Sequence, residues 1–264
     1  MNSLKWINTI AFLAMVGVNI AANVIPIGGV TTGGVSKAYP NLFTPAPITF
    51  AIWGVIYCFL ILFVLFQIGI VGSKSTSSMV RDEIGIAFAF SCALNIAWIF
   101  AWHMKKIELS TILIALLLLS LICITRRIDK VNSSFLSYIM VNVGFDIYFG
   151  WIIAATIANV SVMLTKMNWS GWGISDATWT VIIIIVGALI GAAVVIVENR
   201  YISGLAIIWA YIGIMIKHLS QIGYAGKYMI IVFAAAIGIV IISGAAIYRL
   251  IVPNPRAGVV SSLG

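Results

Sequence analysis

The sequence predicts an all-α integral membrane protein with about eight transmembrane helices, and three observations support this fold class. Of the 264 residues, 62% are apolar and only 8% are charged, whereas a soluble domain carries about 25% charged residues. The apolar residues are grouped in blocks of roughly 20, the length that crosses a hydrocarbon core of about 30 Å. The blocks are continuously apolar, which excludes the alternating strands of a membrane barrel. Because backbone amides in lipid need partners within their own segment, these blocks should form helices.

The apolar blocks define the spans in chain order. We expect them at 5–26, 46–70, 84–104, 108–128, 135–160, 178–197, 202–217 and 228–250. The first follows Lys5 and resembles a signal peptide, but its length and the lack of a small-residue cleavage site favour a retained helix. The sixth is the clearest, because it runs from Thr178 to Val197 without a charge. The seventh, around Trp209, is the shortest, and a re-entrant or tilted segment is the alternative there.

The longest connection covers residues 28–45 and contains Gly, Thr and Ser. A loop of this length is often functional. No Lys-Ser/Thr pair follows its glycines at the spacing that a phosphate-binding loop requires. We therefore expect a flexible connection, with a lid over a ligand as the alternative.

The net charge of +8 does not indicate a nucleic-acid partner, because the 15 basic residues are scattered over helix ends and form no basic face. An even number of spans places both termini on one side of the membrane. Nine basic residues fall on that side and six on the other; the nine are Lys5, Lys74, Arg81, Arg126, Arg127, Lys130, Arg200, Arg249 and Arg256. This excess predicts cytoplasmic termini.

Residue types that carry catalysis or bind metals are sparse. Cys58, Cys92 and Cys123 all lie inside predicted spans and should be apolar packing residues. His103 and His218 are far apart and have no carboxylate cluster near them in the sequence. No catalytic triad, paired carboxylates or Cys-x-x-Cys motif is present. We therefore expect no enzyme activity, no catalytic residue and no metal site.

Aromatic and amide side chains are concentrated on one face of each of three predicted helices. The faces consist of Phe50, Trp53 and Tyr57; Asn95, Trp98 and Trp102; and Tyr148, Trp151, Ala155 and Asn159. If they faced one another, they would line an apolar cavity suited to a flat, hydrophobic ligand. Simple packing of the helices is the alternative. Trp6, Trp169, Trp172 and Trp179 lie at predicted helix ends, where interfacial belts form.

Three segments of the predicted spans carry motifs: Ala93–Trp98 reads Ala-Leu-Asn-Ile-Ala-Trp, Trp151–Asn159 reads Trp-Ile-Ile-Ala-Ala-Thr-Ile-Ala-Asn, and Trp53–Tyr57 reads Trp-Gly-Val-Ile-Tyr. They resemble motifs of the TspO, or translocator protein, family, also called tryptophan-rich sensory proteins, whose Ala-Leu-Asn-x-Ala-Trp signature matches the first segment. Trp151–Asn159 resembles its fifth-helix Trp-x-x-x-Ala-Thr-x-x-Asn pattern, and Trp53–Tyr57 its second-helix Trp-x-x-x-Tyr pattern. The stretch from Phe43 to Gly54 is similar to the longer bacterial branch of the family.

This resemblance implies a five-helix core at 1–165, followed by three additional transmembrane helices at 166–264. In the family, the core holds tetrapyrroles and drug-like aromatic ligands and commonly forms homodimers. The implied ligand is a planar hydrophobic molecule such as a porphyrin or haem, with no cofactor required, and the implied location is the bacterial plasma membrane. The implied ligand-binding residues are Trp53, Asn95, Trp98, Trp151 and Ala155.

The chain also departs from the family pattern. Pro47 replaces the first Trp of the second-helix motif, and Ile147 replaces the proline before the fifth-helix Trp. Val160–Met163 follows Asn159 in place of the Tyr/Arg motif by which animal members recognise cholesterol, so sterol binding is not implied.

Asp146 is the carboxylate deepest in a predicted span, and such groups are functional candidates. At about 100° per residue it lies about 140° around the helix from Trp151, so it should face another helix and find a hydrogen-bond donor there. Lys217 and His218 are the basic candidates on a late helix. A protonated or paired Asp at a helix contact is the alternative.

The spacing of Gly187 and Gly191 would let another helix approach closely.

The aromatic faces and the motif resemblance together favour a sensory or binding protein that holds a planar hydrophobic ligand in the five-helix core. A small-molecule transporter that uses Asp146 and the added helices is the first alternative. A structural membrane module without a ligand is the second.

Overall fold

A computed structural model describes residues 2–25, 29–131 and 134–252. Its elements are α1 (Asn2–Val24), α2 (Thr32–Ala38), η2 (Pro47–Ala51), α3 (Ile52–Gln67), α4 (Lys74–Ile84), α5 (Ala87–His103), α6 (Ile107–Ile128), α7 (Phe135–Lys166), η3 (Gly171–Gly173), α8 (Asp176–Glu198), α9 (Tyr201–Leu219) and α10 (Met229–Ile251), where η denotes a short 3-10 helix. The described residues contain no strand. The predicted all-α fold is therefore confirmed.

The number of membrane-spanning helices agrees with the prediction. Among the described residues, seven helices are long and apolar enough to cross a bilayer, and the pair α4–α5, bent by 57°, gives an eighth if it is counted as one broken span. The 17-residue α5 packs between α1 and α6, so it belongs to the bundle. The segment around Trp209 lies in α9, a continuous helix of 19 residues, so the re-entrant alternative is wrong.

Local sequence explains where several helices begin and end. The hydroxyl groups of Ser134 and Ser175 accept hydrogen bonds from free backbone amides at the starts of α7 and α8. Asn199 ends α8 in the left-handed conformation with φ of 57°, and α9 follows almost immediately. Ile147 carries the backbone N–H that a proline would lack, and α7 runs unbroken for 32 residues through this position.

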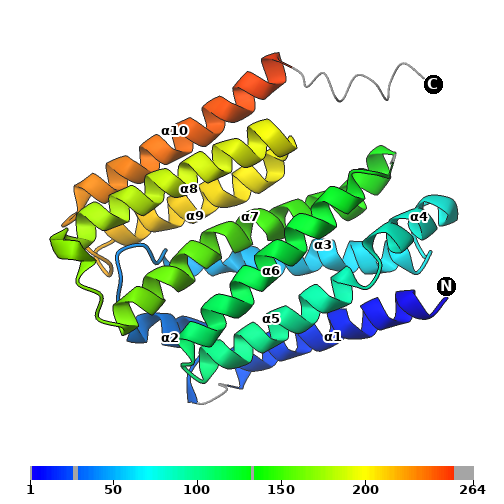
Figure 1. Cartoon of the computed structure of the whole chain (residues 1–264), viewed down its shortest axis with the longest axis horizontal. Coiled ribbons are helices and arrows are strands. Elements are labelled where there is room, and N and C mark those ends of the chain that lie inside the picture. Colours follow the sequence, from blue (N-terminus) through cyan, green and yellow to red (C-terminus); the bar gives the residue numbers. More distant parts are fainter. Residues whose placement is uncertain (1, 26–28, 132–133, 253–264) are drawn as a thin grey trace.

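Helix α7 is the centre of the bundle. It packs against α3 and α6 on one side and against α9 and α8 on the other. Figure 1 shows α8, α9 and α10 as a group beside α7, and α1, α3, α5 and α6 beyond it. The start of α1 and the end of α10 lie at the same end of the molecule, as an even number of crossings requires (Figure 1).

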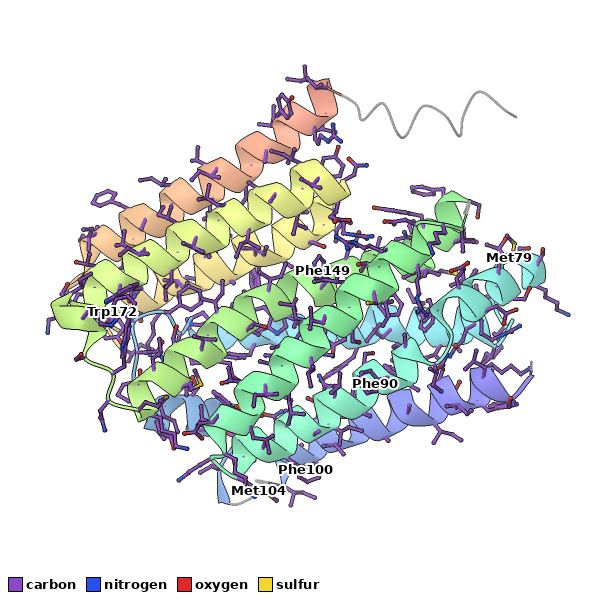
Figure 2. All side chains as sticks on the ribbon, in the orientation of Figure 1. Met79, Phe90, Phe100, Met104, Phe149 and Trp172 are labelled. Atoms are coloured by element: carbon purple, nitrogen blue, oxygen red, sulfur yellow. The ribbon has the colours of Figure 1, made fainter. Side chains whose placement is uncertain are left out.

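The outer surface of the bundle is apolar. Figure 2 labels Phe90, Phe100 and Met104 on α5 and just beyond it, and Phe90 is 55% exposed. Similar exposed apolar side chains occur on α1, α6, α8 and α10. An apolar surface of this extent needs lipid as its solvent, because soluble proteins rarely expose large apolar patches. The chain is therefore an integral membrane protein.

Helix α8 carries two features that the sequence singled out, a tryptophan cluster at its start and Gly187 in its middle. The rings of Trp169, Trp172 and Trp179 cluster where α8 begins, and Trp172 is 77% exposed (Figure 2), as expected of an interfacial belt. A Cβ atom on Gly187 would lie 2.6 Å from the Tyr211 hydroxyl oxygen of α9. The space beside Gly187 is therefore filled by the end of the Tyr211 side chain, and the close approach of another helix stays a prediction.

Candidate functional site

A cavity of about 50 Å³ lies between α3, α5, α7 and α9. It is covered by the cap segment, which we define as residues 32–46. The lining residues are Thr32, Ser36, Phe43, Thr44, Pro45, Phe50, Trp53, Trp98, Trp102, Trp151, Ala154, Ala155, Ala158, Asn159, Val162, Ala210 and Ile214. Four of the predicted site residues, Trp53, Trp98, Trp151 and Ala155, are therefore brought together in one wall.

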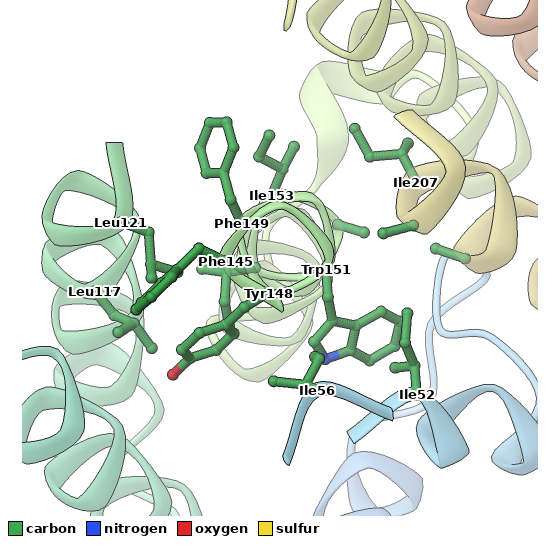
Figure 3. Packing of buried hydrophobic residues seen from close by; sticks show 14 of the residues in the cluster. Ile52, Ile56, Leu117, Leu121, Phe145, Tyr148, Phe149, Trp151, Ile153 and Ile207 are labelled. Atoms are coloured by element: carbon green, nitrogen blue, oxygen red, sulfur yellow. The ribbon is translucent and has the colours of Figure 1, made fainter. Parts of the chain in front are cut away.

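Trp53 is the centre of the aromatic wall. Its ring centroid lies 6.4 Å from those of Trp98 and Trp151 and 5.8 Å from that of Tyr148. The Trp53 and Trp151 rings meet edge to face at 85°, a favourable arrangement for aromatic pairs. Figure 3 shows Trp151 projecting from α7 toward Ile52 of α3, whereas the Tyr148 hydroxyl points away from it and is hydrogen-bonded to Asn95 of α5. The rings pack mainly on one another, which explains why so little empty volume remains.

Asn159 fixes the ring of Trp98 from the α7 side of the cavity. Its Oδ1 accepts a hydrogen bond of 3.0 Å from Trp98 Nε1, and its Nδ2 donates to Ser110 Oγ at 3.1 Å and to Thr111 Oγ1 at 2.7 Å. Asn159 is 2% exposed, so these bonds compensate the burial of its amide. The indole nitrogen of Trp151, by contrast, is buried without a hydrogen-bond partner in the described structure.

Asn95 does not line the cavity, so its predicted place in the wall is wrong. Its Oδ1 accepts a 2.7 Å hydrogen bond from Asn19 Nδ2 of α1, and its Nδ2 donates to the Tyr148 hydroxyl of α7 at 2.9 Å. The side chain therefore joins three helices as an interhelical polar contact. Helical spacing placed Asn95 on the face of Trp98 but could not reveal its partner on α1.

The cap segment contains the short helix α2 and is hydrogen-bonded to the core. Thr31 caps the start of α2 by accepting a hydrogen bond from the amide of Gly34. The indole of Trp102 donates to the carbonyl of Thr32 at 3.1 Å, and the hydroxyl of Thr32 lies 3.0 Å from a ring nitrogen of His103. The expectation of a flexible connection is not tested by these contacts, and the alternative of a cover over the cavity gains support from them.

The C-terminal helices hold the other end of the cap segment. The amide of Ala46 donates to the carbonyl of Gly213 in α9 at 2.9 Å. A ring nitrogen of His218, at the end of α9, lies 2.9 Å from the carbonyl oxygen of Leu42. His218 is fully buried, so this contact is shielded from solvent. The cover of the cavity is thus attached to the added helices as well as to the core.

Helix α9 is a wall of the cavity that the sequence reasoning missed. Ala210 and Ile214 face the cavity from this helix. A Cβ atom on Gly150 of α7 would collide with the backbone of Ser203, so the two helices touch through their main chains. The available signal was the small residues of α9 at helical spacing, Ser203, Ala206, Ala210 and Gly213. The division of the chain at residue 165 remains a prediction, and the cavity draws on both sides of it.

Asp146 is buried and paired with Arg200. Arg200 Nη1 lies 2.6 Å from Asp146 Oδ1, and Nη2 lies 2.5 Å from Asp129 Oδ2. The prediction that Asp146 faces another helix and finds a donor is confirmed. The named candidates Lys217 and His218 are wrong, because they lie at the opposite end of α9. Arg200 was counted as a loop residue, although it is 4% exposed and its guanidinium reaches into the bundle.

The described residues contain no group of three or more His, Cys, Asp and Glu side chains that could hold a metal ion. Cys58, Cys92 and Cys123 are free thiols. The cavity wall is built mainly from aromatic and aliphatic side chains, with the hydroxyls of Thr32, Ser36 and Thr44 and the amide of Asn159. Such a surface can bind an apolar molecule by contact and orient it through few polar atoms.

Comparison with known proteins agrees with the resemblance in the motifs. The sequence model of the TSPO-like protein family matches residues 5–248. No curated protein and no solved structure matches the chain. The match runs through the added helices as well as the five-helix region, which places α8, α9 and most of α10 within the family pattern. The chain therefore belongs to the family of TSPO-like proteins.

Proposed function

We propose that the chain is a non-catalytic binding or sensory protein that holds a planar, apolar molecule in the covered cavity. The observation that carries the proposal is the meeting of Trp53, Trp98 and Trp151 with Ala155 at one cavity beneath the cap segment. Flat rings give a planar ligand a large contact area at a low entropic cost. The partnerless indole nitrogen of Trp151 would gain an acceptor from a ligand that carries a carbonyl or a ring nitrogen.

The size of the cavity constrains how such a ligand would bind. The present volume is about 50 Å³, whereas pockets for small organic ligands measure about 300–1,000 Å³. The cavity must therefore enlarge before it accepts an aromatic ligand, and a tetrapyrrole would require the larger opening. Displacement of the cap segment is the simplest route, because its contacts to the core and to α9 include few hydrogen bonds.

The transporter alternative has weaker support. A transport route needs polar groups that continue from the cavity toward the other membrane face. Asp146 and Arg200 do not line the cavity, and they satisfy each other as a buried pair. Along α7 the residues between Asp146 and Trp151 of the cavity wall are Ile147 to Gly150, which are apolar apart from the Tyr148 hydroxyl.

The experiment is a binding screen on the purified protein with protoporphyrin, haem and smaller flat aromatic compounds. Trp151→Ala should weaken binding of the best ligand by about 1 kcal/mol or more, roughly five- to tenfold in Kd. Trp6→Ala is the matched control, because Trp6 is 55% exposed on α1 and lies outside the cavity. Ala155→Phe should also weaken binding, since the larger ring would occupy ligand space. Equal Kd values for Trp151→Ala and Trp6→Ala would contradict the proposed site.

A further inference from the structure

A second cavity, of about 600 Å³, lies between α7 and α8. We call it the α7–α8 cleft. It is lined by Pro40, Asn41, Leu42, Phe43, Thr156, Ile157, Val160, Ser161, Leu164, Thr165, Asn168, Trp169, Gly171, Asp176, Trp179, Thr180, Ile183, Val186 and Ile190. Phe43 lines both cavities, and all other lining residues differ. The cleft is therefore a separate compartment whose volume falls in the range of small-molecule sites.

The two ends of the cleft differ in polarity. Asp176 opens α8 and lies near the belt of Trp169 and Trp179 at the membrane interface. Val186 and Ile190 follow about 15 and 21 Å further along the helix axis, which is about the middle of a 30 Å hydrocarbon core. They are 48% and 41% exposed, so the deep end opens to lipid. The cleft thus suits a molecule with a polar head and an apolar tail.

The hydrogen bonds of the lining show which head group fits. The hydroxyls of Thr156, Ser161, Thr165 and Thr180 each donate to a carbonyl of their own helix, at 2.7 to 2.9 Å. The Trp179 indole donates to Gly171 O at 2.7 Å. These groups have no hydrogen left to donate, but each hydroxyl oxygen still has lone pairs that can accept. Apart from the amides of Asn41 and Asn168, the lining therefore offers mainly acceptors.

The charge of the lining also favours a ligand that donates hydrogen bonds. Asp176 is the charged residue in the lining, and no Lys or Arg among the described residues forms an ion pair with it. The faces of Trp169 and Trp179 nearby attract cations through their ring quadrupoles. A carboxylate, aromatic faces and free acceptor oxygens together favour a cationic group that carries N–H donors.

We propose that the α7–α8 cleft binds an amphipathic organic ammonium ion with a single apolar tail, which it takes up from the bilayer. The ammonium group lies against Asp176 and donates hydrogen bonds to the hydroxyl oxygens of the lining. The tail lies along Val160, Ile183 and Val186 toward the lipid-exposed end. The groups that would hold the ammonium ion, Asp176 and the hydroxyls of α7 and α8, do not line the covered cavity, although the cap segment contributes Phe43 to both. The proposal therefore does not rest on the function proposed for the covered cavity.

The test measures saturable binding of radiolabelled dodecylamine to the protein in phosphatidylcholine nanodiscs at pH 7, with empty discs subtracted. Dodecanol and dodecanoate have the same tail with a neutral and an anionic head. Dodecylamine should bind most tightly and dodecanoate least. Equal saturable binding of all three, or none for dodecylamine, would overturn the proposal. If phosphatidylethanolamine in the discs competes with dodecylamine, the proposal of a single-tailed ligand is overturned, and the cleft binds the head group of a phospholipid instead.

Variants locate the binding. Asp176→Asn should lower the affinity for dodecylamine about fivefold, the upper end for a partly exposed ion pair, and should leave dodecanol unchanged. Asp82→Asn is the control, because it removes a carboxylate from the exposed part of α4. Val160→Trp should abolish saturable binding by filling the cleft, and Ile183→Trp repeats this test from α8. Binding that survives both tryptophans in folded protein would show that the site lies elsewhere.

Discussion

The buried ion pair between Arg200 and Asp146 gives the sharpest prediction about stability. Replacing Arg200 by Met would leave the Asp146 carboxylate inside the bundle, where its side chain is 4% exposed, without its counter-ion. Removing one partner of a buried pair costs about 3–5 kcal/mol. Asp129, the second partner of Arg200, has a 47% exposed side chain, so water can replace the lost contact there. The cost therefore arises at Asp146.

The measurement is thermal unfolding in detergent, followed by circular dichroism. At about 2–4 °C per kcal/mol for a chain of this size, Arg200→Met should lower Tm by about 6–20 °C. Arg126→Met is the matched control, because the side chain of Arg126 is 62% exposed and pairs with Glu198 at the surface. Such exposed pairs contribute about 1 kcal/mol or less.

A double variant separates the ion pair from simple loss of packing. Asp146→Leu combined with Arg200→Met removes both charges, and apolar pairs often match buried ion pairs in stability. The double variant should therefore recover most of the lost Tm, and the cycle of single and double variants should give a coupling of more than 1 kcal/mol. A double variant as unstable as Arg200→Met alone would refute the reasoning.

Two further predictions concern helix packing and topology. Gly150→Val should lower Tm, because the new side chain would collide with the backbone of Ser203 at a cost of about 1–3 kcal/mol. Gly244→Val is the control and should have little effect, because no atom lies within 4 Å of its Cβ position. Similar losses of Tm in the two variants would contradict the contact. Reporter fusions after residue 264 should show a cytoplasmic location and insertions within 28–45 an external one, as the distribution of basic residues predicts; the reverse would overturn the assignment.

The sequence predicted the helices well because lipid imposes a strong rule on length and polarity. A block such as Thr178–Val197 has one stable solution in a membrane, so α8 follows from composition alone. Span ends were less certain. The predicted fifth span ended at residue 160, yet α7 continues to Lys166, because polar residues at the membrane interface can remain helical. Helix α4 was also missed, because its polar residues were placed in the connection before the third span, and Gly85 with φ of 59° separates it from α5.

The site was predictable where one helix decides a face and unpredictable where two distant segments meet. Spacing on α7 placed Trp151, Ala155 and Asn159 on the cavity side. Helical spacing could not identify hydrogen-bond partners that lie 50 or more residues away in the sequence. Asn95 was therefore predicted to bind a ligand, whereas its side chain is hydrogen-bonded to Asn19. Arg200 was missed for a related reason, because a basic residue between two spans normally reaches water. Its long side chain instead turns into the bundle toward two carboxylates.

The contacts of α9 limit which ligand preference the motif resemblance implies for this chain. Three contacts fix this helix against the core: Arg200 with Asp146 at one end, Ser203 with Gly150 next to it, and Gly213 with Ala46 about 20 Å from the start of the helix. Pro47 begins η2, and η2 packs against α9. The helix thus occupies a position beside the second-helix motif and adds Ala210 and Ile214 to the cavity wall. The planar apolar ligand that the motif resemblance implies should therefore be tested against variants of these two side chains, because they form the side of the cavity that α9 contributes.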